Sequence, residues 1–137
     1  MRVVLDTNIL FSALISPHGV PEAIYRAWRA ARFEVVTSQT QLEEIRRASH
    51  YPKFKAVLQP SKVGTMLNNL QRAIVLEKLT ITTEAEDPDD SFLLAMALQG
   101  DADYLVTGDR RAGLLQRGHI ERTRIITPAA FCDVVLK

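Results

Sequence analysis

The chain alternates short apolar runs, rich in β-branched residues, with longer stretches that carry apolar residues at helical spacing. The runs at 2–5, 33–36, 79–82, 104–106 and 124–126 predict strands, and their lack of strict polar alternation predicts burial on both faces. Strands that alternate with helices form βαβ units. We therefore expect an α/β fold, a three-layer α/β/α sandwich with a central parallel sheet.

Capping residues and apolar spacing mark the helices between these strands. Pro21 fits the first turn of a helix. Ser38 with Gln41 matches a capping box, and Thr40 with Glu43 offers a second frame for the same helix. The predicted helices span 8–15, 21–32, a stretch from Ser38 or Thr40 to Tyr51, 61–76, 92–98, and a last stretch that begins at Pro128.

Length and composition predict one globular domain over residues 1–137. A chain of 137 residues with 47% hydrophobic residues is large enough for one core and too apolar for disorder. No apolar stretch approaches the roughly 20 residues of a membrane helix. Asp6 interrupts the apolar start and no cleavage site follows, so we expect no export signal. The single Cys132 excludes an intrachain disulfide framework, and we expect a cytoplasmic protein that does not enter a membrane.

The charges are unevenly distributed along the chain. The totals nearly cancel, with 17 Lys and Arg against 16 Asp and Glu, yet residues 84–109 hold eight acids and no Lys or Arg. Carboxylates crowded together raise each other's pKa and repel, unless a cation neutralises them. Hard divalent cations such as Mg²⁺ bind carboxylate oxygens. The histidines are scattered at positions 18, 50 and 119, which argues against zinc. The rest of the chain therefore carries an excess of positive charge, which suits a polyanionic substrate.

Carboxylates follow several predicted strands, at the sheet edge where parallel α/β folds form their sites. Asp6 follows the first strand, Asp109 follows 104–106, and Asp89 and Asp90 precede the helix at 92–98. Each has a structural alternative, because Asp6, Asp89 or Asp90 could cap a helix and Asp109 could serve a turn. As a set, they predict a metal site.

Helix geometry separates the two glutamates that follow the second strand. Glu43 has Arg46 and Arg47 at i+3 and i+4, which favours a solvated face with ion pairs. Glu44 has Ala48 at i+4, so its face is less charged and better placed near the sheet. We therefore expect Glu44 to belong to the site.

In order and spacing, these residues resemble the PIN-domain ribonucleases from Arg2 to Phe131. They are most similar to the small prokaryotic single-domain members classed as toxins of toxin–antitoxin pairs. The similar blocks are Val3-Val4-Leu5-Asp6-Thr7-Asn8, Ser38-x-x-x-Leu42-x-Glu44-Ile45, Asp87-Pro88-Asp89-Asp90-Ser91-Phe92-Leu93-Leu94-Ala95, Tyr104-Leu105-Val106-Thr107-Gly108-Asp109 and Ile125-Ile126-Thr127-Pro128-x-x-Phe131.

The resemblance implies a metal-dependent endoribonuclease. It assigns the acidic quartet to Asp6, Glu44, Asp90 and Asp109, with Asp6, Asp90 and Asp109 as ligands of Mg²⁺ or Mn²⁺. Thr7, Asn8, Ser38 and Thr107 match the small polar residues beside these acids, and Asp87 lies in the same acidic loop. Relatives often carry a further acid where Arg110-Arg111 follows here, so the number of ions, one or two, stays open. The implied partners are RNA, an antitoxin protein and a second copy of the chain in a homodimer.

Two alternatives to a ribonuclease remain at this point. The first is another metal-dependent phosphohydrolase with Asp6 as nucleophile, although the haloacid-dehalogenase type requires a second Asp where Asn8 stands. The second is a non-catalytic module that keeps the fold and binds RNA or protein.

Overall fold

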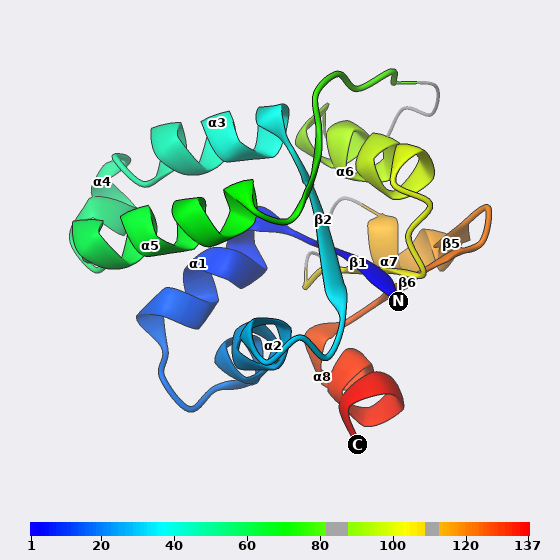
Figure 1. Ribbon diagram of the computed structural model, residues 1–137, viewed down its shortest axis with the longest axis horizontal. Helices are drawn as coiled ribbons and strands as arrows, with labels where there is room; N and C mark the ends of the chain where they lie inside the picture. The colour runs from blue at the N-terminus through cyan, green and yellow to red at the C-terminus, as the bar shows by residue number, and fades with distance from the viewer. Residues whose placement is uncertain (82–87, 109–112) are drawn as a thin grey trace.

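A computed structural model describes residues 1–81, 88–108 and 113–137. The described residues form a six-stranded sheet in the order β3-β2-β1-β4-β6-β5 (Figure 1). All strand pairs are parallel except β5 with β6. The predicted α/β class is confirmed, with a mostly parallel mixed sheet in place of a wholly parallel one. The strands are β1 (Arg2–Leu5), β2 (Glu34–Ser38), β3 (Ile74–Leu76), β4 (Tyr104–Val106), β5 (His119–Ile120) and β6 (Thr123–Ile126).

Helices cover both faces of the sheet because alternate residues of each strand point to opposite sides. Val3 and Leu5 of β1 pack into one core cluster, whereas Val4 packs into the other. Helices α1, α2, α3, α5 and α8 contribute to the first cluster, and α6 and α7 to the second. The helical elements are α1 (Thr7–Ile15), α2 (Val20–Arg29), α3 (Gln39–Ala48), α4 (Pro52–Lys55), α5 (Pro60–Gln71), α6 (Pro88–Gln99), α7 (Leu114–Arg117), α8 (Pro128–Phe131) and the π-helical segment η1 (Cys132–Leu136).

The predicted strand at 79–82 is not formed over its described residues 79–81, residue 82 lies outside the described residues, and the predicted helix at 61–76 is too long. Helix α5 ends at Gln71, and the chain forms β3 beside β2, where Val36 lies opposite Ile74. Ile74 sits four residues after Leu70, so its apolar side chain suits the end of a helix and an edge strand equally. The side chain of Gln99 instead bonds the backbone of Lys78 and Thr80.

The remaining strand predictions agree with the structure to within two residues at each end. Tyr104–Val106 is reproduced exactly as β4, and the second strand extends two residues further, to Ser38. The short elements α7 and β5 were not predicted. Four and two residues long respectively, they show no usable periodicity.

The direction in which strands are added to the sheet reverses between the parallel strands β1 and β4. From β1 the chain builds β2 and β3 on one side, then crosses to β4 on the other side. Ligands of open α/β sheets bind at such a switch point, outside the carboxyl ends of the strands. The ends of β1 and β4 are therefore where a site is expected.

Within the described ranges, no helix is long and apolar enough to cross a membrane.

Gly100, directly after α6, marks a close approach of the helix end to β2. A Cβ atom there would lie 2.5 Å from Cγ1 of Val36 and 2.8 Å from the Met96 carbonyl oxygen. We predict that Gly100→Ala lowers the free energy of unfolding by about 1–3 kcal/mol through overpacking. Urea denaturation measures this loss.

Gly64, inside α5, gives the matched control because a Cβ there would meet nothing within 4 Å. Gly64→Ala should raise stability by about 0.5–1 kcal/mol, since alanine favours helices. Equal effects of the two substitutions would contradict the packing of α6 against β2.

Candidate active site

Asp6 is the first residue after β1, and its side chain caps α1. Its Oδ1 accepts a hydrogen bond from the Asn8 backbone N–H at 3.1 Å, and the side chain is buried. Asp6 therefore does cap α1, as the structural alternative for this residue expected, and Asn8 lies inside the helix. Capping uses Oδ1 and leaves Oδ2 to a second contact.

That second contact joins the two strands of the switch point. The hydroxyl of Thr107, directly after β4, donates to Oδ2 of Asp6 at 2.7 Å, and Thr107 is fully buried. The Asp6 backbone N–H also donates to the Val106 carbonyl at 3.0 Å. Capping and the Thr107 bond together fix the orientation of the Asp6 carboxylate.

A buried glutamine ties the end of β1 to the end of β2. The Gln41 amide nitrogen donates to the Leu5 carbonyl at 2.7 Å and to the Thr7 hydroxyl at 3.3 Å. Its Oε1 accepts a bond from the Thr37 hydroxyl at 2.6 Å. Gln41 is 1% exposed, so these bonds replace water. They fix the start of α3, one turn before Glu44.

The predicted capping box at Ser38 forms only in part. The Ser38 hydroxyl accepts from the Gln41 backbone N–H at 3.1 Å, so the Ser38 frame holds and the Thr40 frame does not. The Gln41 side chain crosses to β1 and does not reach back to the cap. Sequence patterning assigned Gln41 to a cap and missed its role in linking the strands.

Three carboxylates of the predicted quartet line one pocket of about 260 Å³ at the switch point. Asp6 comes from the end of β1, Glu44 from α3 and Asp90 from the first turn of α6. Asp90, like Asp6, is buried. Residues more than 80 positions apart in the chain thus share one cavity.

The choice between the two glutamates agrees with the geometry. Glu44 is half-buried and lines the pocket, whereas Glu43 is exposed and does not.

Other predicted site residues are placed in different ways. Thr7 and Asn8 line the pocket beside Asp6, and Ser38 is buried as the cap of α3 without lining it. Helix α6 begins at Pro88, so Asp90 lies inside its first turn, not at its cap. Asp109 and Asp87 lie outside the described residues, as do Arg110 and Arg111.

Basic and aromatic side chains also line this pocket. They are Arg47, Tyr51, Lys53 and Phe54, from the end of α3 and from α4. The sequence pattern predicts Tyr51 only as the end of a helix. Pro52 starts α4, which brings Lys53 and Phe54 into the pocket that the carboxylates line.

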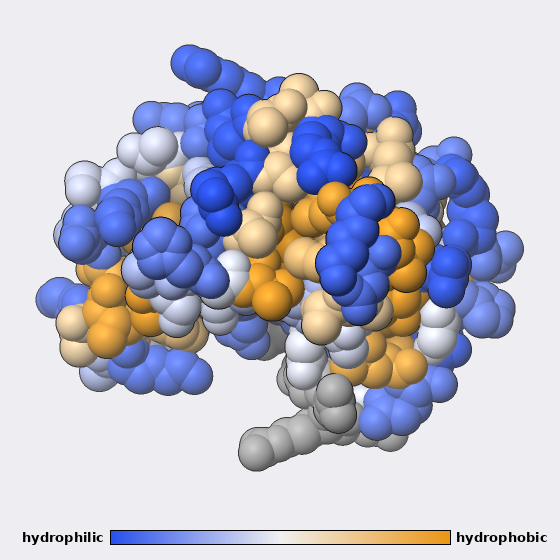
Figure 2. Space-filling model, turned by 90° about the horizontal axis from the view of Figure 1, so that it is seen from below, coloured by the Kyte–Doolittle hydropathy of each residue, from blue (hydrophilic) through white to orange (hydrophobic). Residues whose placement is uncertain are grey.

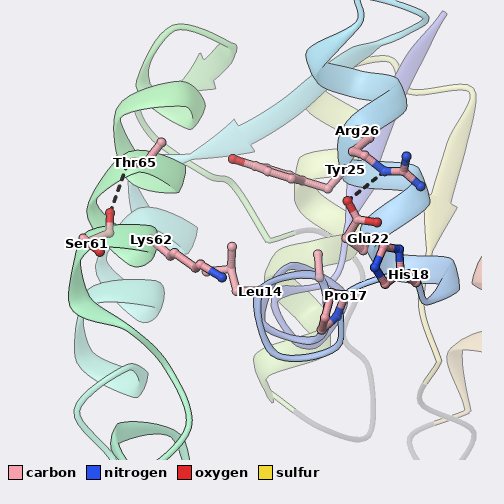
Figure 3. A pocket seen from close by; sticks show the side chains of 10 residues that line it. Leu14, Pro17, His18, Glu22, Tyr25, Arg26, Ser61, Lys62 and Thr65 are labelled. Carbon is pink, nitrogen blue, oxygen red and sulfur yellow. Dashed lines mark hydrogen bonds and ion pairs between the residues drawn. The ribbon is translucent and has the colours of Figure 1, made fainter.

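A larger pocket of about 480 Å³ lies between α1, α2 and α5 (Figure 3). Its one acidic side chain, Glu22, forms an ion pair with Arg26 at 2.7 Å. His18, Tyr25 and Lys62 also line it. This pocket lacks a set of carboxylates and therefore does not compete as the metal site.

The donor atoms in the smaller pocket suit a hard cation. Asp6, Glu44 and Asp90 offer carboxylate oxygens only, which is the ligand type of Mg²⁺ and Mn²⁺. Over the described ranges, no three His, Cys, Asp or Glu side chains converge closely enough to hold an ion by themselves. The set is thus chemically suitable but contributes only part of a coordination shell.

Comparison with known protein families matches residues 2–111 to the PIN domain. The chain belongs to the PIN-domain family. It is also similar to an uncharacterized protein of Methanocaldococcus jannaschii, with 28% identity over 114 residues that cover 80% of this chain and 72% of that protein. The predicted family is confirmed.

PIN domains are generally nucleases and usually bind divalent metal ions. Family membership therefore indicates a hydrolase of nucleic acid phosphodiester bonds, with RNA as the polymer that the family suggests. The switch-point pocket is the natural place for this chemistry in the PIN domain described here.

Gln41 is testable as a structural link beneath this site. We predict that Gln41→Ala lowers the free energy of unfolding by about 1–3 kcal/mol, because the buried Thr37 hydroxyl and Leu5 carbonyl lose their bonds. Chemical denaturation measures the loss. Gln71→Ala, at an exposed position, is the control and should stay within about 0.5 kcal/mol of the wild type. Equal stability of the two variants would contradict the role of Gln41.

Proposed function

We propose that this PIN domain is an endoribonuclease that uses Mg²⁺ or Mn²⁺ to hydrolyse RNA phosphodiester bonds. The observation that carries the proposal is the meeting of Asp6, Glu44 and Asp90 in one pocket at the β1–β4 switch point. A shared ligand accounts for carboxylates from three separate elements in one pocket, whereas three unrelated helix caps do not.

Asp6, Asp90 and Asp109 would hold the ion, and Glu44 would complete the set directly or through water. When bound, the ion supplies a Lewis acid that polarises the scissile phosphate and activates the attacking water. The assignment of Asp109 rests on its place directly after Thr107-Gly108, in the family pattern. No side chain needs to act as a nucleophile.

The protein's own contribution is to fix the carboxylates before substrate arrives. Thr107 holds Oδ2 of Asp6, and the first turn of α1 holds Oδ1, so the carboxylate has one orientation. Gln41 joins the ends of β1 and β2 and so sets where α3 presents Glu44. Such fixed groups need little rearrangement during the reaction.

The structure favours neither alternative function. A phosphohydrolase with Asp6 as nucleophile needs a second acid two residues later, and Asn8 occupies that position inside α1. A non-catalytic module does not require three carboxylates in one pocket.

We predict that the wild-type protein cleaves RNA with Mg²⁺ or Mn²⁺ and that EDTA abolishes cleavage. Asp6→Asn and Glu44→Gln should each reduce the cleavage rate by more than about 10-fold, the loss seen when even supporting residues of a metal site are changed. Gel-based cleavage of a labelled RNA measures the rate. Asn is a good helix cap, so Asp6→Asn should remain folded.

Glu43→Gln is the matched control, because Glu43 is exposed and adjacent to Glu44. Its cleavage rate should equal that of the wild type. Full activity of both Asp6→Asn and Glu44→Gln would refute the site, and the absence of cleavage by wild type with every RNA and metal would favour a binding module.

The proposal extends to a biological role as the toxin of a toxin–antitoxin pair, in the form of a homodimer. It rests on the resemblance to the small prokaryotic PIN toxins. A small antitoxin would then inhibit the enzyme by placing a basic side chain or peptide near the carboxylates. For the dimer, α2 and the C-terminal helices lie next to each other and carry apolar surface (Figure 2). Val20 and Val134 are both exposed there.

A charge on this face tests the homodimer. Light scattering after gel filtration should give the wild type twice the mass of one chain, and Val134→Asp should give one chain, because burying an unpaired carboxylate is costly. Val134 is 53% exposed, so the variant should fold. A monomeric wild type would contradict the dimer.

A further inference from the structure

A basic stretch of the chain contributes side chains to the same pocket as Asp90 of the acidic stretch. Residues 45–76 contain six Lys and Arg and no acid, the opposite of residues 84–109. Two of these bases, Arg47 and Lys53, line the same pocket as Asp6, Glu44 and Asp90. The other four do not line it.

Aromatic contacts hold the two bases in place. The ring of Phe54 packs on Phe11 of α1 with centroids 4.7 Å apart, which anchors the short helix α4. The Lys53 ammonium lies 4.8 Å from the centre of the Phe54 ring. The Nε of Arg47 donates to the Tyr51 hydroxyl at 3.4 Å. The cations are thus arranged on a packed wall.

Tyr51 lies between the two bases in the chain and lines the pocket while being 47% exposed. An exposed aromatic ring beside cations is the combination with which proteins bind single strands, because bases stack on the ring and phosphates contact the cations. The carboxylates repel phosphate, so a polynucleotide that approaches them needs such cations close by.

We propose that Arg47, Tyr51 and Lys53 form a contact site for single-stranded polynucleotide next to the catalytic carboxylates. One base stacks on Tyr51, and the flanking phosphates contact Arg47 and Lys53. The inference rests on the proposed nuclease function and adds the residues that hold the substrate strand beside the carboxylates: a duplex keeps its bases paired and offers none to Tyr51.

Binding by the full chain tests this site separately from cleavage. The background is the Asp6→Asn protein, so that the probe stays intact, and the probe is a fluorescein-labelled single-stranded RNA 12-mer, with DNA of the same sequence in a second arm. Fluorescence anisotropy gives the Kd at several salt concentrations. Thermal unfolding checks each variant, and because Tyr51, Arg47 and Lys53 are exposed, their midpoints should not change.

Tyr51→Ala should raise the Kd by about 5-fold to 100-fold, whereas Tyr51→Phe, which keeps the ring, should stay within about twofold. Lys53→Gln should reduce the slope of log K against log salt by about 0.7, the value for one phosphate contact on a single strand. Lys55→Gln is the control on the same helix, since Lys55 is exposed and does not line the pocket. It should leave the slope unchanged.

Wild-type Kd values for Tyr51→Ala, or equal slopes for Lys53→Gln and Lys55→Gln, would overturn the contact site. An equal loss with blunt duplex RNA would overturn stacking on Tyr51. If wild type cleaves no RNA but binding still depends on Tyr51, the nuclease proposal fails and this site stands. If wild type cleaves RNA and Tyr51→Ala leaves the Kd unchanged, the contact site is refuted and the nuclease proposal stands.

Discussion

The hydrogen bond from Thr107 to Asp6 is the contact on which the site depends. It joins the residues that follow β1 and β4, the two neighbouring strands between which the chain reverses its direction of growth. Parallel strands end at the same sheet edge, so side chains that follow them meet there. Asp6 also caps α1. The same carboxylate therefore contacts the first turn of the helix and the end of β4, and it lines the pocket. The capping role of Asp6 therefore does not exclude the role proposed for it in the site.

The fold and most of the described site were predictable because their signals are local. The β1 and β4 runs are short, mostly apolar and followed directly by Asp6 and Thr107, so the position of these two residues at a sheet edge could be predicted without any tertiary contact. The choice of Glu44 over Glu43 required only helix spacing. The strand β3 was misplaced because Ile74 suits a helix end and an edge strand equally, and its pairing with β2 decides between them. Gln41 and Tyr51 were missed for a similar reason: each acts on a partner that only the folded chain brings near.

Acidic and basic residues that are separated along the chain line the same pocket in the folded protein. Asp90 comes from the acidic stretch, and Arg47 and Lys53 come from the basic one. The near-zero net charge conceals this arrangement. Opposite charges in one pocket offset each other in part, which lowers the cost of bringing the carboxylates together. The larger pocket between α1, α2 and α5 lacks this opposition, since its Glu22 is already paired with Arg26.

The central claim is that a divalent cation is held where Asp6, Glu44 and Asp90 meet. The most direct measurement is an anomalous difference map from crystals of the protein grown with Mn²⁺. The account predicts a strong peak within coordination distance of Asp6 and Asp90 in wild type, and its loss in Asp6→Asn crystals. The absence of a peak in this pocket at saturating Mn²⁺, or the same peak in both proteins, would contradict it.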